Sequence, residues 1–262
     1  MSAIEIAAVA LGGVAVYMTL LWLASLALRN SGIVDIFWGF GFVVVAITYF
    51  VLGDGFEGRK ILVLALVAVW GLRLSAYIGW RNAGKEADYR YQAMRRRAGE
   101  TWWWRSYVQV FLLQGVLLWV ISAPLLAAMR NEDPDHFVAT DVIGALIWAA
   151  GIFFEAVGDW QLARFKADPA NRGKVMRGGL WRYTRHPNYF GDAAVWWGLW
   201  VIAALTPSGG ITVIAPIVMT LLLLRVSGVA LLERTITKRR PEYADYIATT
   251  SAFVPWFPKK AS

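Results

Sequence analysis

The sequence predicts an all-α integral membrane protein with about seven transmembrane helices. Hydrophobic residues make up 58% of its 262 residues, and the mean hydropathy of +0.49 exceeds what a soluble domain of this length carries. Apolar runs of about 17 to 25 residues, the length that crosses a bilayer, recur along the chain. We expect a single transmembrane domain over residues 1–262, with helices at Ile4–Leu28, Ile33–Leu52, Ile61–Trp80, Tyr107–Met129, Val142–Ala163, Tyr189–Leu205 and Ile211–Leu232.

The placement of basic residues predicts the orientation of these helices, because Lys and Arg accumulate in cytoplasmic loops. With the N-terminus outside, the inner segments hold 21 Lys and Arg, whereas the outer loops hold Arg59, Lys60 and Arg130. We therefore expect a cytoplasmic C-terminus and a place in the bacterial inner (plasma) membrane. The same bias accounts for most of the net charge of +8, so no nucleic-acid partner is expected.

Composition also excludes several kinds of site. The chain has no cysteine, which excludes disulfides and thiolate chemistry. Its two histidines, His136 and His186, are too few for a multi-histidine metal site, and no metal is predicted. The first apolar segment lacks a basic start and a small-residue cleavage site, so we expect a retained helix rather than a signal peptide.

The second span and the loop after the third hold the first candidate site residues. Asp35 lies about one turn inside its span, where an ionised carboxylate needs a partner. It is either a helix-start charge favoured by the macrodipole or a functional acid. Tyr89 and Tyr91 flank Arg90, and two phenols beside an arginine can polarise a carbonyl or grip a phosphate.

The same loop continues into three consecutive arginines, Arg95–Arg97, and three consecutive tryptophans, Trp102–Trp104. Arginines beside a span favour anionic lipids, and tryptophans form belts at the membrane interface. We therefore expect these residues to contact membrane lipid.

The end of the fifth span places Glu155, Asp159 and Lys166 on one helical face. Two carboxylates and an amine at the end of a membrane helix indicate a wet cavity rather than a solvated face. The loop that follows carries Arg172 and Lys174, and its paired glycines allow backbone amides to approach an anion.

The stretch Arg182–Asp192 is mostly polar and adjoins the sixth apolar run. A helix start with Asn188 as N-cap and Asp192 in the first turn explains those two residues alone. A binding site explains the rest together, with arginines for phosphate oxygens and tyrosines for stacking. The residues left to that explanation are Arg182, Tyr183, Arg185, His186 and Tyr189.

Residues 33–258 resemble the steroid 5-alpha-reductase-like superfamily, most closely its bacterial branch. The Arg-His-Pro-Asn-Tyr-x-Gly-Asp run of Arg185–Asp192 is also similar to that of sterol delta-14 reductases. Further segments carry the resemblance: Val34–Gly39, Trp70–Tyr77, Asp88–Gln92, Gly158-Asp159, and the region from Glu233 through Tyr243 and Tyr246 to Pro255.

The resemblance implies a membrane oxidoreductase that transfers hydride from NADPH to an activated C=C bond of a lipophilic enone, sterol-like or isoprenoid-like, with a cytoplasm-facing site. Steroid reductases carry a Gln-Glu pair in the second span, where this chain offers only Asp35. From their chemistry, the expected catalytic residues are Tyr89 or Tyr91, or Asp35 if protonated in its apolar site, which would stabilise the enolate oxygen. The residues expected to bind the cofactor are Asp159, Lys166, Arg172, Lys174, Arg182, Tyr183, Arg185, His186, Asn188, Tyr189, Asp192, Glu233, Tyr243 and Tyr246.

Two other functions stay open at this point. Isoprenylcysteine carboxyl methyltransferases and phospholipid methyltransferases carry a similar Arg-His-Pro-x-Tyr-x-Gly run for S-adenosylmethionine, although most lack an acid at the position of Asp192. A lipid-binding protein without catalysis is the other alternative. Neither the lipophilic substrate nor the oligomeric state follows from the sequence.

Overall fold

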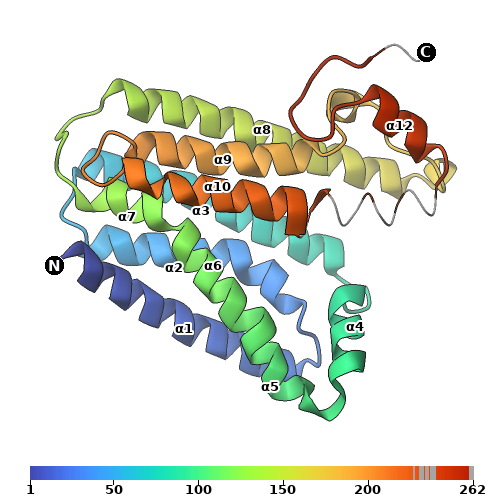
Figure 1. The fold of residues 1–262 in the computed structure, drawn as a ribbon, viewed down its shortest axis with the longest axis horizontal. Coiled ribbons are helices and arrows are strands. Elements are labelled where there is room, and N and C mark those ends of the chain that lie inside the picture. The colour runs from blue at the N-terminus through green and yellow to red at the C-terminus, as the bar shows by residue number, and fades with distance from the viewer. Residues whose placement is uncertain (227, 230–232, 234–235, 237–239, 260–262) are drawn as a thin grey trace. The chain divides into compact units, whose positions relative to one another are not determined.

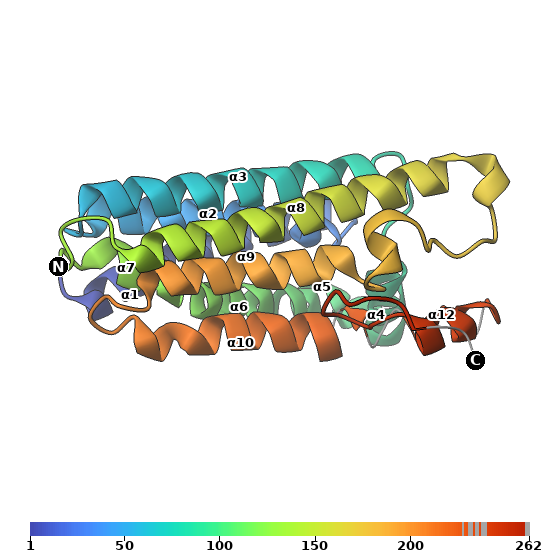
Figure 2. The same ribbon diagram turned by 90° about the horizontal axis from the view of Figure 1, so that it is seen from above.

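The computed structural model describes residues 1–226, 228–229, 233, 236 and 240–259, and within these every regular element is a helix (Figures 1 and 2). Five helical segments of the described chain are long and apolar enough to cross a membrane: Ala3–Ala27 (α1), Ile33–Leu52 (α2), Glu57–Asn82 (α3), Tyr89–Arg130 and Ala139–Ala167 (α8). These helices support an integral membrane protein. The count of seven spans and the orientation of the termini stay predictions.

The last two predicted spans correspond to shorter helices. Pro187–Ala203 (α9) covers most of the sixth. In the seventh, the short turn Gly210–Val213 (η5) leads into Ile214–Leu221 (α10) and the π-helical turn Leu222–Val226 (η6). The rest of that predicted span reaches residues 227 and 230–232, which lie outside the described residues.

The segment Tyr89–Arg130 is divided where the sequence predicted one uninterrupted span over Tyr107–Met129. A helical break falls at Ser122, because Pro124 has no N–H to donate to the preceding turn. The pieces are Tyr89–Ala98 (α4), Gly99–Thr101 (η1), Trp102–Ser106 (α5), the π-helical Tyr107–Leu112 (η2), Leu113–Ile121 (α6) and Ala123–Arg130 (α7).

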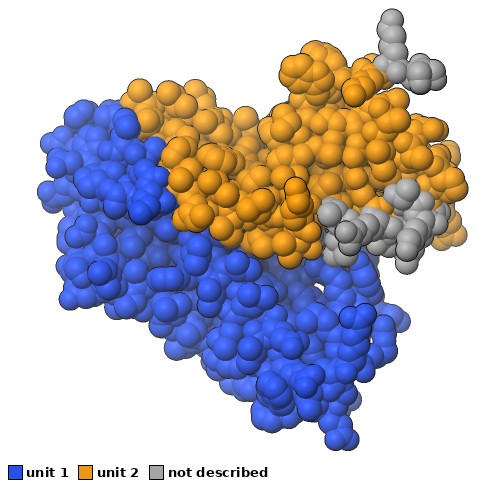
Figure 3. All heavy atoms as spheres, viewed as in Figure 1, with its two compact units in different colours: residues 1–138, 203–212 blue, residues 139–202, 213–262 orange. Residues whose placement is uncertain are grey.

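The chain divides into two compact units, residues 1–138 with 203–212 and residues 139–202 with 213–262 (Figure 3). In unit 1, α2 packs against α1, α3, α6 and α7. Gly39 of α2 faces Gly71 of α3 so closely that a Cβ on Gly71 would lie 2.5 Å from the Gly39 carbonyl oxygen. Small residues at such crossings let helical backbones touch.

Unit 2 contains α8, Pro169–Asn171 (η3), Gly179–Arg182 (η4), α9, α10, η6 and Tyr243–Thr249 (α12). Its two longest helices, α8 and α9, run side by side (Figures 1 and 2). Glycines seven residues apart line their contact: Gly144, Gly151 and Gly158 on α8, and Gly191 and Gly198 on α9. Since seven residues are about two helical turns, the glycines on each helix share one face.

The spacing between α8 and α9 leaves no room for side chains at this line. A Cβ on Gly151 would lie 2.6 Å from the backbone nitrogen of Val195, and one on Gly191 would lie 2.4 Å from the backbone nitrogen of Glu155. Backbone atoms cannot yield as a flexible side chain does. The glycines therefore determine how closely the polar ends of α8 and α9 approach.

We expect Gly151→Ala and Gly191→Ala each to lower the free energy of unfolding by about 1 to 3 kcal/mol, as overpacking does. Gly12→Ala is the matched control, because no atom lies within 4 Å of a Cβ at that exposed position of α1. Thermal unfolding of the purified full chain in detergent measures the effect. Equal stability of all three variants would contradict a close α8–α9 contact.

Candidate functional site

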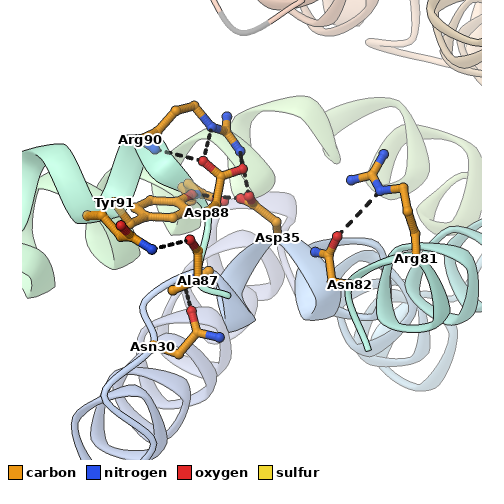
Figure 4. A network of polar contacts seen from close by, with 11 residues as sticks. Asn30, Asp35, Arg81, Asn82, Ala87, Asp88, Arg90 and Tyr91 are labelled. Carbon is orange, nitrogen blue, oxygen red and sulfur yellow. Dashed lines mark hydrogen bonds and ion pairs between the residues drawn. The ribbon is translucent and has the colours of Figure 1, made fainter. Parts of the chain in front are cut away.

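In unit 1, a hydrogen-bonded network joins the start of α2 to the start of α4 (Figure 4). Asp35, the third residue of α2, accepts a hydrogen bond from the Tyr91 hydroxyl at 2.7 Å through Oδ1. Its Oδ2 lies 2.8 Å from Nη2 of Arg90. The side chain of Asp88 caps α4 by accepting from the backbone N–H of Arg90 at 2.8 Å, which places Arg90 and Tyr91 in the first turn.

Arg90 bridges two carboxylates in this network. Its Nε lies 3.0 Å from Oδ1 of Asp88, and its Nη2 meets Asp35. Burial opposes the ionisation of Asp88, but the hydrogen bonds from the Arg90 side chain and backbone outweigh it and hold the pKa of Asp88 below its usual value. An ionised Asp88 thereby fixes the direction in which the guanidinium approaches Asp35.

The Tyr91 hydroxyl is held on two sides. Besides donating to Asp35, it accepts a hydrogen bond at 3.3 Å from Nε2 of Gln114 in α6, and Tyr91 as a whole is 8% exposed. A buried phenol with its orientation set in advance suits the stabilisation of charge on a carbonyl oxygen.

The structure brings together only two of the three predicted catalytic residues. Asp35 and Tyr91 are in direct contact, whereas Tyr89 is 60% exposed and lies outside this network. Asp88 and Gln114 were not among the predicted site residues. Asp88 had a sequence signal, an Asx residue two positions before Arg90 at a helix start, and Gln114 had another, an amide in an apolar run.

In unit 2, the close approach of α8 and α9 brings Asp159 and Asn188 together. Nδ2 of Asn188 donates to Oδ1 of Asp159 at 3.1 Å. The alternative interpretation, with Asn188 as N-cap and Asp192 in the first turn, is wrong, because α9 begins at Pro187 and no acidic residue lies in its first turn. Proline fits the first position of a helix since it has no N–H to leave unpaired. Asn188 is thereby free to bond to α8, and Asp192 falls in the second turn.

The loop between α8 and α9 folds back onto the end of α8. The backbone N–H of Leu180 donates to Oε1 of Gln161 at 2.9 Å, and Nε1 of Trp181 donates to the carbonyl oxygen of Gly158 at 3.1 Å. These bonds fix the segment that leads into Arg182–Asp192.

Arg185, His186 and Glu233 form a cluster in which Arg185 and His186 are buried and Glu233 is half-buried. Glu233 Oε1 lies 2.7 Å from Nε of Arg185 and 3.1 Å from Nε2 of His186, and Glu233 Oε2 lies 3.2 Å from Nη2 of Arg185. Nη1 of Arg185 donates to the carbonyl oxygens of Ile247 and Thr250. Such a forked pairing is the geometry that arginine and carboxylate favour.

The C-terminal segment is bound to the stretch Trp181–Arg185 through its backbone. The N–H of Arg185 donates to the Ser251 carbonyl oxygen at 2.9 Å, and the N–H of Trp256 donates to the Tyr183 carbonyl oxygen at 2.9 Å. The Tyr246 hydroxyl donates to the Trp181 carbonyl oxygen. Residues 250–256 are thus bound to the rest of unit 2.

The remaining predicted residues of unit 2 differ in exposure. Asp159 and Asp192 are buried, at 5% and 9% exposed. Tyr189 stacks on His186 with ring centroids 5.5 Å apart, and the ring of Tyr243 lies 5.6 Å from that of Tyr246. The exposed residues are Lys166, Arg172, Lys174, Arg182 and Tyr183.

The cluster shifts the pKa of Glu233 and that of the neighbouring Tyr243, both of which lie outside the spans. Burial opposes ionisation of Glu233, but the hydrogen bonds from His186 and Arg185 outweigh it and lower the pKa of Glu233 from 4.5 to about 2. Burial, followed by the charge of Glu233, raises the pKa of Tyr243 to about 12. Glu233 therefore favours the folded state above pH 4.5, and this contribution is lost as the pH falls toward 2.

We expect acidification from pH 5 to pH 3 to loosen the segment that follows Glu233. Hydrogen exchange at the amides of residues 246–251, corrected for the intrinsic effect of pH, should rise in this window. Glu233→Gln should show rapid exchange already at neutral pH, whereas the exposed control Glu242→Gln should behave as the unmodified protein does. Exchange that stays constant down to pH 3 would contradict the assignment.

Comparison with known proteins identifies the family of this chain. A family model described as "Protein of unknown function (DUF1295)" matches residues 21–250. The uncharacterized protein C594.04c of Schizosaccharomyces pombe is 24% identical over 211 residues, which cover 71% of this chain and 61% of that protein. The steroid 5-alpha-reductase DET2 of Arabidopsis thaliana is 31% identical over 78 residues, 30% of this chain and 29% of that protein.

The matches differ in how much they establish. The chain spans 61% of the length of the first relative and 29% of the second, so neither match covers a whole protein. No solved structure matches. The family model, in contrast, covers most of the chain, and this protein therefore belongs to the DUF1295 family, a steroid 5-alpha-reductase-like family.

Proposed function

We propose that this protein is a membrane oxidoreductase that transfers hydride from NADPH to an activated C=C bond of a lipophilic, sterol-like or isoprenoid-like enone, from a cytoplasm-facing site. The observation that carries the proposal is the Tyr91 hydroxyl held between Asp35 and Gln114. Membership of a steroid 5-alpha-reductase-like family supports an oxidoreductase, and the similarity to DET2 supports the same class.

In the proposed reaction, the Tyr91 hydroxyl turns its single O–H from Asp35 to the carbonyl oxygen of the enone. It stabilises the negative charge that develops on this oxygen as the double bond is reduced. As the double bond is reduced, Tyr91 gives its proton to the enolate oxygen and is reprotonated from water, while Gln114 keeps its bond to the phenol oxygen. Asp35 accepts the O–H again once the product has left. Arg90 neutralises Asp35 and keeps the pair in place.

The proposal assigns the cofactor to unit 2, because exposed cations and buried polar groups occur there together. NADPH, when bound, supplies the hydride that adds to the enone. Arg172, Lys174 and Arg182 are exposed and would bind its phosphates. Asn188 would bind a donor of the nucleotide, since its Oδ1 is buried and accepts no hydrogen bond within the part of the chain that the structure describes.

In this proposal Asp159, Asp192, Lys166, Tyr183 and Tyr189 complete the set of residues that bind the cofactor. The remaining predicted cofactor residues have a positioning role in this proposal. Arg185 already pairs with Glu233 and with backbone carbonyls. Together with His186, Tyr243 and Tyr246, these two residues hold the shape of the stretch that carries Asn188.

The cofactor assignment predicts that NADPH raises the thermal unfolding temperature of the full chain, since a ligand that binds only the native state stabilises it. Asn188→Ala and Asp192→Ala should each weaken NADPH binding about tenfold, as the loss of a buried hydrogen bond does. Asn82→Ala is the matched control, because it removes the same amide from unit 1 at the end of α3.

The outcome separates three functions. Unchanged NADPH affinity in both Asn188→Ala and Asp192→Ala would remove this stretch from the cofactor site. Stabilisation by S-adenosylmethionine in place of NADPH would favour a methyltransferase. No response to either nucleotide would favour a lipid-binding protein without catalysis.

The mechanism predicts that Tyr91→Phe lowers enone-dependent NADPH consumption by at least about 100-fold, the usual contribution of a positioned acid. NADPH binding should stay unchanged in this variant. Tyr107→Phe is the matched control, since the Tyr107 hydroxyl contacts Thr19 and not the Asp35 network. A loss in Tyr89→Phe with none in Tyr91→Phe would move the proton donor to Tyr89.

A further inference from the structure

The chain turns at Gly99–Thr101, between α4 and α5, and we call this turn the elbow. None of its residues takes part in the proposed reaction. The last turn of α4 carries Arg95–Arg97, and Gly99 then takes a positive φ of 57°, which allows the chain to turn into α5. Two hollows of about 440 and 210 Å³ open at this turn. Arg95 and Gly99 line both of them.

The hollows are lined by more positive than negative charge. The larger is lined by Gln92, Arg95, Arg96 and Gly99. The smaller reaches the end of α1, where Arg29, Ser25 and Ser31 join the lining, together with the carboxylate Glu100. Nη1 of Arg95 donates to the Arg29 carbonyl oxygen at 3.3 Å, so the two arginines lie on adjacent walls. Guanidinium and hydroxyl groups on adjacent walls suit phosphate oxygens.

Aromatic and apolar side chains border the same hollows. Trp102 and Trp103 line the smaller one, and Nε1 of Trp22 donates to the Trp103 carbonyl oxygen at 2.9 Å, which ties α5 to α1. Trp103 is 58% exposed, and Leu28, at 66% exposed, lies just beyond the end of α1. Exposed tryptophans beside exposed apolar surface are typical of the headgroup level of a bilayer.

The elbow also lies at the ends of two candidate spans. The helix Ala3–Ala27 ends there, and the arginines precede the apolar part of the segment Tyr89–Arg130. A phosphate in the hollows would therefore lie beside exposed apolar surface, such as the Trp103 ring that lines the smaller one. A soluble anion would leave that apolar surface exposed, whereas the acyl chains of a lipid cover it.

We propose that this elbow binds the phosphate headgroup of an anionic membrane lipid, with Arg95, Arg96 and Arg29 around the phosphate and the acyl chains along α5 and η2. The site lies wholly within unit 1 and does not depend on the proposed oxidoreductase activity.

The test uses the delipidated full chain in a neutral detergent, titrated with phosphatidylglycerol or with phosphatidylcholine of the same acyl chains. Phosphatidylglycerol should raise the unfolding temperature and stay bound in native mass spectrometry, and phosphatidylcholine should do so at much higher concentration only. Arg95→Gln and Arg96→Gln should each weaken phosphatidylglycerol binding about fivefold, the usual effect of one basic residue at an anionic lipid surface.

Arg97→Gln is the matched control, because Arg97 lies on the same helix and carries the same charge but lines neither hollow. It should bind phosphatidylglycerol as the unmodified chain does. If Arg95→Gln disturbs folding through its bond to the Arg29 carbonyl, Arg96→Gln carries the test. An equal loss of phosphatidylglycerol affinity in Arg97→Gln would show that the lipid is held by diffuse charge attraction rather than at a defined site. This result would overturn the proposal.

Two further outcomes overturn the proposal. Equal affinity for phosphatidylglycerol and phosphatidylcholine would show that the anionic headgroup is not recognised. Stabilisation by inorganic phosphate or glycerol 3-phosphate at the concentrations at which the lipid acts would assign the hollows to a soluble anion.

Discussion

Charged side chains in a protein made of apolar helices have to meet opposite charge or a hydrogen-bond donor, because an isolated ion there is costly to desolvate. This requirement organises both units. In unit 1, Asp35 meets Arg90 and Tyr91 from a segment 55 residues further along the chain. In unit 2, Arg185 meets Glu233, which lies 48 residues away. The first pairing brings the start of α4 to the start of α2, and the second involves the turn that precedes α9.

Backbone packing then determines which polar groups can be reached. The glycine line between α8 and α9 removes the side chains that would separate the two helices, and Asn188 consequently contacts Asp159. In unit 1 the cap formed by Asp88 has a comparable effect, since it begins α4 where Tyr91 faces Asp35. Small residues and caps thus act on the sites without any reactive group of their own.

The two units contribute different chemistry to the proposed function. The Tyr91 hydroxyl is buried, and Asp35 and Gln114 set its position, as a proton donor requires. Unit 2 combines exposed cations such as Arg172 and Arg182 with a buried amide at Asn188, a combination suited to a ligand with phosphates at one end and polar rings at the other. The Arg185–Glu233 pair holds the stretch that carries Asn188 in place.

Run length determined the helical class and the positions of the first three and the fifth long helices, because a span about as long as the bilayer is thick leaves a local signal. The helices α3 and α8 extend up to four residues beyond the predicted bounds. Charge within those runs also indicated Asp35 and Asp159 as residues that need partners. Which partner each one meets was decided by tertiary structure: Asp35 pairs with Arg90 through the cap at Asp88, and Asp159 bonds to Asn188 because glycines let α8 and α9 touch. A contact between residues tens of positions apart depends on how helices pack. The spacing of residues along one helix does not determine it.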